Sequence, residues 1–65
     1  MSLKETAWDA IEKAKTEGKT RLVMHPVYRY GVSLEDREAI GKYAQILGIE
    51  LHIDDTLNEG EYVIE

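Results

Sequence analysis

The sequence predicts a small α+β domain in which two helices pack on one face of a three-stranded sheet. Apolar residues recur at helical spacing over residues 3–17 and again over 33–49, and they alternate with polar residues over 49–54. The predicted order of elements is therefore α-β-α-β-β, with the second face of the sheet partly open to water. A chain of 65 residues suffices for one domain, which we place at residues 1–65.

The first helix is expected over residues 3–17, and Gly18 follows it as a C-terminal stop signal. Its apolar stripe consists of Leu3, Ala7, Ile11 and Ala14. The segment TRLVMH (20–25) has the apolar and β-branched composition of a short strand, which Pro26 limits. The aromatic segment VYRYGV (27–32) is expected to be a loop or a ragged strand end.

The second helix has clear start and stop signals. Ser33 is a suitable N-cap, Asp36 stands three residues further on where a capping-box acid is found, and Gly48 is the C-terminal stop. The expected buried stripe consists of Ile40, Tyr43, Ala44 and Leu47.

The C-terminal part reads as two strands. IELHID (49–54) alternates, so that Ile49, Leu51 and Ile53 share one face. A polar turn over 55–61 separates this strand from YVIE (62–65), and we therefore expect residues 49–65 to form a hairpin.

The net charge of −5 is unevenly distributed along the chain. Residues 20–32 contain two arginines and no acid, whereas residues 48–65 contain six acids and no lysine or arginine. The overall charge opposes general nucleic-acid binding at long range, but a local basic patch remains compatible with it.

Several classes of protein do not fit this composition. The chain has no cysteine, which excludes disulfides and cysteine–zinc sites, and it has no apolar run of membrane-spanning length. We expect a cytoplasmic protein that does not contact a membrane.

The segments RLVMHP, SLEDREAIGKYAQILGIEL and GEYVIE together resemble the Arg-x-x-x-His single-strand nucleic-acid-binding domain, also called the R-three-H domain. The resemblance covers about residues 20–65 and implies the same order of elements. It also implies a non-enzymatic module that binds single-stranded DNA or RNA. The family arginine matches Arg37, but Gly41 stands at the position of the family histidine, so the motif itself is incomplete.

Gly41 lies within a helical pattern, where glycine costs about 0.8–1 kcal/mol relative to alanine. Three interpretations are open. A histidine site has decayed, or the glycine clears space for a base or partner to approach, or tight packing against the first helix near Trp8 excludes any larger residue.

The candidate nucleic-acid site combines cations and aromatic rings. The arginines would hold phosphates, and the tyrosines would stack on unpaired bases for about 1–3 kcal/mol each. The candidate residues are Arg21, Tyr28, Arg29, Tyr30, Arg37, Gly41 and Lys42. The structural alternative is that the tyrosines close one end of a small core and keep their hydroxyl groups in water.

No catalytic or metal-binding constellation is recognisable. His25 and His52 lack a ligand spacing typical of metal sites, and so short a chain leaves little room for an active-site cleft. We therefore expect no enzyme activity, no metal and no cofactor.

The alternative function is a protein-interaction module that has lost nucleic-acid binding. It would present the acidic hairpin of residues 50–65 to a basic protein partner. We expect a monomer, although the last strand could also pair edge to edge in a dimer.

Overall fold

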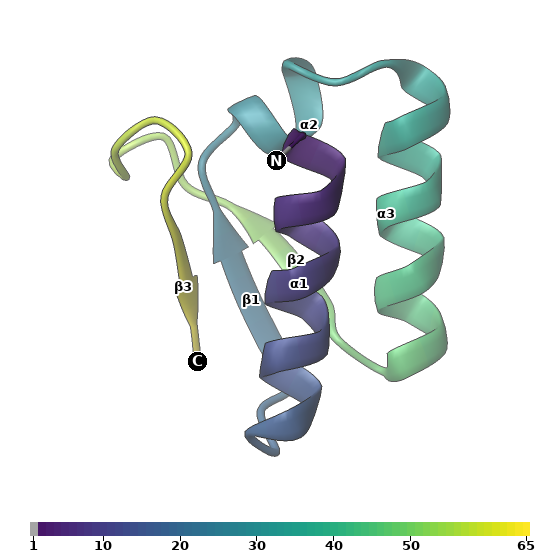
Figure 1. Ribbon diagram of the computed structural model, residues 1–65. Coiled ribbons are helices and arrows are strands. Elements are labelled where there is room, and N and C mark those ends of the chain that lie inside the picture. The colour runs from purple at the N-terminus through teal and green to yellow at the C-terminus, as the bar shows by residue number, and fades with distance from the viewer. Residues whose placement is uncertain (1) are drawn as a thin grey trace.

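The computed structural model describes residues 2–65. Two long helices and a three-stranded sheet form the domain (Figure 1), which confirms the predicted fold class. The elements are α1 (Leu3–Thr16), β1 (Arg21–Met24), α2 (Val27–Tyr30), α3 (Leu34–Leu47), β2 (Glu50–Ile53) and β3 (Tyr62–Ile64).

The strand order is β2-β1-β3, which shows that the predicted hairpin over residues 49–65 is wrong. β1 pairs with β2 in parallel and with β3 in an antiparallel arrangement, so it separates the two C-terminal strands. The physical reason is burial. Leu22 and Met24 of β1 are almost completely buried, whereas β2 and β3 at the sheet edges keep more of their side chains exposed.

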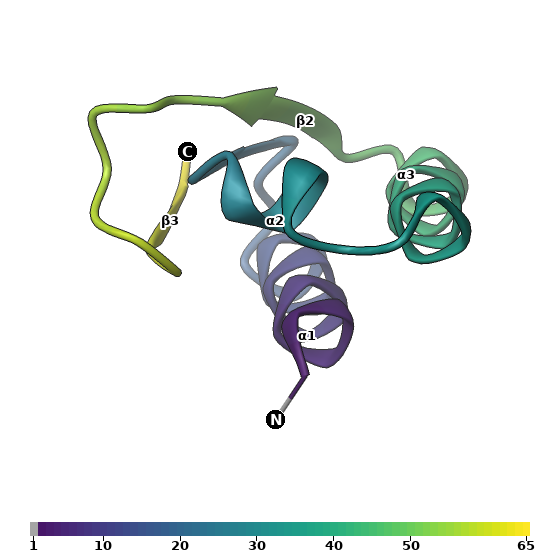
Figure 2. The ribbon, with the colours of Figure 1, turned by 90° about the horizontal axis from the view of Figure 1, so that it is seen from above.

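Both long helices lie on the same face of the sheet, as Figure 2 shows in the view from above. The register aligns Leu22 with Leu51 and Met24 with Ile53, so the alternate side chains of β1 and β2 face the helices together. Leu51 and Ile53 thus share the core-facing side, as the alternation in the sequence predicted.

Small residues on α1 allow it to pack closely against its neighbours. Its buried residues are Ala7, Ala10, Ile11 and Ala14. Beside this row, the rings of Trp8 and Tyr43 stack between α1 and α3 with their centroids 4.8 Å apart. The Tyr43 hydroxyl donates a hydrogen bond of 3.0 Å to Glu12, which raises the pKa of Tyr43.

The predicted ends of α3 are confirmed. The Ser33 hydroxyl accepts a hydrogen bond of 3.1 Å from the Asp36 N–H, which is the N-cap interaction expected from the sequence. Gly48 closes the helix with φ of +74°, a left-handed conformation that residues with a Cβ rarely adopt.

The segment predicted as a loop or ragged strand end contains the helical turn α2. Pro26 already has helical backbone angles, and its carbonyl accepts a hydrogen bond of 2.8 Å from the Tyr30 N–H. His25 Nδ1 accepts the Val27 N–H at 3.0 Å, which satisfies a donor at the start of the turn. These local bonds stabilise the turn. With four residues, it is too short to produce a recognisable hydrophobic periodicity in the sequence.

Tyr28 connects this turn to the C-terminal loop, because its hydroxyl donates a hydrogen bond to the Gly60 carbonyl. The ring is 2% exposed and belongs to the core. Tyr28→Phe is expected to lower the free energy of unfolding by about 1 kcal/mol, since the carbonyl loses its donor. Urea denaturation at pH 7 measures this, with Tyr30→Phe, whose ring is largely exposed, as a control that should leave stability unchanged.

Tyr28 also gives the fold a pH dependence on the alkaline side. Burial and, secondarily, the nearby Tyr62 raise the pKa of Tyr28 above its ordinary value of 10.0. Folding therefore favours the protonated phenol, and this stabilisation is present below about pH 10 and disappears as the pH rises through the folded-state pKa. Denaturation between pH 9 and 11 should show a steeper loss of stability for the natural chain than for Tyr28→Phe.

Candidate nucleic-acid interface

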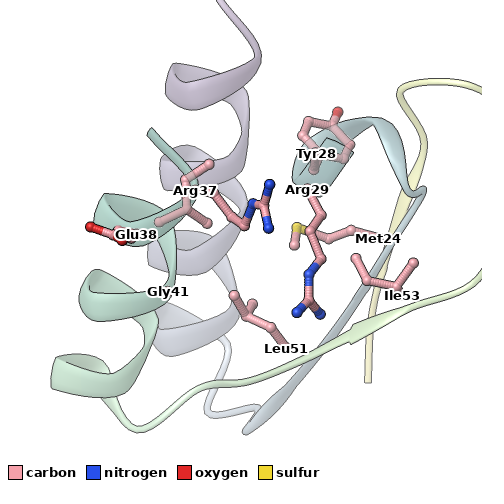
Figure 3. A pocket seen from close by; sticks show the side chains of 9 residues that line it. Met24, Tyr28, Arg29, Arg37, Glu38, Gly41, Leu51 and Ile53 are labelled. Carbon is pink, nitrogen blue, oxygen red and sulfur yellow. The ribbon is translucent and has the colours of Figure 1, made fainter. Parts of the chain in front are cut away.

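A cavity of about 280 Å³ opens at the carboxyl ends of the two parallel strands. Met24 ends β1 and Ile53 ends β2, and both line the cavity together with the first turns of α3 (Figure 3). In open sheets with parallel strands, ligands bind outside the carboxyl ends of the strands. The cavity lies at the corresponding end of the parallel pair of β1 and β2 in this mixed sheet.

Two arginines from different elements point into this space. Arg29 comes from α2 and Arg37 from the start of α3, and Figure 3 shows both guanidinium groups between α3 and the sheet. Among residues 2–65, no carboxylate lies within ion-pair distance of either group. The Nε–H of Arg37 is buried, and no acceptor among the described residues forms a hydrogen bond with it. A buried donor without a partner is unusual in folded proteins, and an acceptor on a ligand would satisfy it.

Tyr30 lies beside both arginines. Its ring is 69% exposed, and its centroid lies 5.8 Å from the Arg29 guanidinium carbon and 5.7 Å from that of Arg37. Cation–π attraction at these distances helps to hold the two side chains near each other. The arrangement combines an accessible aromatic ring with two nearby guanidinium groups.

Tyr28 and Tyr30 thus have different roles, although both were predicted to stack on bases. Tyr28 lines the cavity and is buried in the core, as the structural alternative predicted, but its hydroxyl bonds to the Gly60 carbonyl and not to water. Tyr30 is presented to solvent, where a ring can stack on a ligand.

Gly41 borders the cavity one helical turn after Arg37. A Cβ atom at this position would have no neighbouring atom within 4 Å, so tight packing near Trp8 is wrong as an explanation of the glycine. Tyr43, not Gly41, contacts Trp8. The two other interpretations, a lost histidine and close approach of a ligand, stay predictions.

The cavity walls include residues that sequence analysis did not assign to a site. Met24, Ile40, Leu51 and Ile53 provide an apolar lining, and the alternation in the sequence had placed the last two on one face. Glu38 also borders the cavity, but its carboxylate points away from the guanidinium groups (Figure 3). The site therefore combines an apolar lining with two guanidinium groups.

Arg21 and Lys42 are not brought to this cavity. Arg21 starts β1 on the opposite face of the sheet, and its Nε lies 4.0 Å from a carboxylate oxygen of Glu65. Lys42 is exposed on α3 and does not belong to the cavity lining formed by residues 2–65. Only part of the predicted cationic set therefore shares one surface.

The histidines make local contacts. His25 bonds to the turn after β1, and His52 Nε2 lies 2.9 Å from a carboxylate oxygen of Glu50. Within residues 2–65, the structure groups no three histidine, cysteine or acidic side chains in a way that could hold a metal ion. In the same range no helix has both the length and the apolar character needed to cross a membrane.

Comparisons of the chain with protein-family models, with curated proteins and with solved structures returned no match. The resemblance to the R-three-H domain therefore rests on the sequence motifs alone, and it stays a prediction.

Replacement of Gly41 by alanine tests whether the space beside this residue is open, as the structure shows. Because the new methyl group would point into open space within a helix, Gly41→Ala should raise the free energy of unfolding by about 1 kcal/mol. Gly48→Ala is the contrasting variant and should lower stability by about 1 kcal/mol, since alanine is strained at positive φ. Urea denaturation of both variants measures these changes, and a destabilised Gly41→Ala would contradict the structure.

Proposed function

We propose that this domain binds single-stranded DNA or RNA, weakly and without strong sequence preference, on the surface around Arg29, Tyr30 and Arg37. One observation carries the proposal: two guanidinium groups without acidic partners among residues 2–65 share one apolar cavity and one exposed aromatic ring.

The two arginines suit the nucleic-acid backbone. A guanidinium group stays charged at any relevant pH, and its planar arrangement of donors matches the oxygens of a phosphate. Separate elements hold Arg29 and Arg37, which allows each to contact a different phosphate of one strand. The buried Nε–H of Arg37 would gain the acceptor that it lacks.

The exposed ring and the cavity suit the bases. Tyr30 can stack on an unpaired base, which every base permits because each has a π face. Gly41 leaves the adjacent helix surface free of side-chain atoms, so that a base or sugar can approach the backbone closely. Such contacts do not distinguish sequences, because stacking and phosphate binding read no base edge.

The acidic character of the whole chain limits the affinity that we expect for nucleic acid. A net charge of −5 repels a nucleic-acid strand at a distance, so binding depends on the local cationic surface. We expect measurable affinity at low salt and a marked loss at high salt.

The test is a titration of labelled protein with short oligonucleotides of thymine and of uracil, followed by NMR at several salt concentrations. Amide shifts should concentrate near Arg29, Tyr30, Arg37 and Gly41. Arg37→Ala and Arg29→Ala should each weaken binding about tenfold and reduce the salt slope by about 0.7, the value for one phosphate contact on a single strand.

Arg21→Ala is the matched control, because it removes the same charge from the opposite face of the sheet. It should leave both the affinity and the salt slope nearly unchanged. An equal loss for Arg21→Ala and Arg37→Ala would mean that only total charge matters, and the absence of shifts at millimolar oligonucleotide would refute the proposal.

A further inference from the structure

The sheet has a second face, turned away from α1 and α3, which the proposed nucleic-acid site does not use (Figure 2). The register places Val23 of β1 between His52 of β2 and Val63 of β3, so one row of side chains crosses all three strands on this open face. Neither long helix covers this row.

The open face is hollow, and its lining combines apolar and polar side chains. A cavity of about 440 Å³ is lined by Val23, Leu57 and Val63, among other residues. Val63 is 42% exposed on this face. Contact with a partner would remove this surface from water.

The rim of the open face is acidic. Glu50 and Glu65 face it from the two edge strands, and Asp54 borders it where β2 ends. Thr56 donates two hydrogen bonds to Asp54, which lower the pKa of this carboxyl group and keep it ionised. Arg21 is the cation among the described residues that line the cavity, and Glu65 lies next to it.

We propose that the open face docks a basic amphipathic segment of a partner protein. Apolar side chains of the segment would cover Val23, Leu57 and Val63, and its lysines or arginines would contact Glu50, Asp54 and Glu65. Charge complementarity favours this occupant, because among the described residues three acids face a single arginine here. His52 lies on the same face and contacts Glu50.

Other occupants fit less well. A nucleic acid would place phosphates against Asp54 and Glu65, which repel them. A second copy of the chain would bring the same acidic rim against itself, and like charges facing each other oppose association.

The probe for this surface is a short amphipathic peptide of leucine and lysine, and its counterpart with glutamate in place of lysine is the charge control. With isotope-labelled protein, the lysine peptide should shift the amides of Val23, His52 and Val63, whereas the glutamate peptide should not. Shifts confined to α1 and α3, or no shifts at millimolar peptide, would overturn the proposal.

Charge reversal locates the contact. The double variant Glu50→Lys/Glu65→Lys should weaken binding of the lysine peptide about tenfold. Asp9→Lys/Glu17→Lys makes the same charge change on exposed positions in and after α1 and should keep most of the affinity. Equal losses in the two double variants would show an effect of total charge and would refute docking on the open face.

A third variant avoids any dependence on charge. Val63→Ser removes exposed apolar surface and should weaken peptide binding several-fold, while the NMR spectrum verifies that the domain stays folded. Arg37→Ala should leave peptide binding unchanged, so failure of this proposal and failure of the nucleic-acid proposal can be told apart. Concentration-dependent dimerisation that Val63→Ser abolishes would assign the open face to a second copy instead.

Discussion

The rest of the structure depends on the position of β1 between two unlike neighbours. Its parallel pairing with β2 requires a long connection, which α2 and α3 provide, because parallel strands cannot be joined by a tight turn. β3 pairs antiparallel with β1 along the edge of β1 that β2 leaves free. The segment between β2 and β3 must therefore cross from one side of β1 to the other. Both long helices then cover the face of the sheet on which Leu22 and Met24 are buried.

This topology also determines where the cations gather. The connection between the parallel strands begins at the carboxyl end of β1, so α2 and the first turn of α3 lie over that end of the sheet. Arg29 and Arg37 are eight residues apart in the sequence and point into one cavity because their elements meet there. The apolar lining of that cavity is a continuation of the core, since Ile40 and Met24 belong to both.

The two faces of the sheet differ in charge as well as in covering. Two guanidinium groups that have no acidic partner among residues 2–65 border the side on which the helices lie, whereas acids border the open side. The net charge of the chain conceals this separation. A ligand that suits one side is repelled from the other, so the two proposed surfaces would select different partners and could be occupied together.

Gly41 occupies a helical position at which packing gives no reason for a glycine. The cost of a glycine inside a helix is not recovered through packing, because no atom outside its own helix approaches its missing side chain. The alanines of α1, in contrast, are fully buried, and their small size has a packing reason. Packing therefore does not explain Gly41, and a lost histidine and close approach of a ligand both stay predictions.

The sequence alone determined the two long helices and the three strands of this protein, but not the helical turn α2. Ser33 and Gly48 delimit α3 because capping depends on bonds between neighbouring residues, and the alternation through Leu51 and Ile53 identifies β2 because side chains of a strand alternate between faces. Neither signal contains information about which strand pairs with which. Only the tertiary structure decided that β1 separates the two C-terminal strands, that Arg37 meets Arg29 while Arg21 lies on the other face, and that Gly41 faces open space. These outcomes depend on how the whole chain buries its most apolar strand, which is a competition among distant segments and not a property of any one of them.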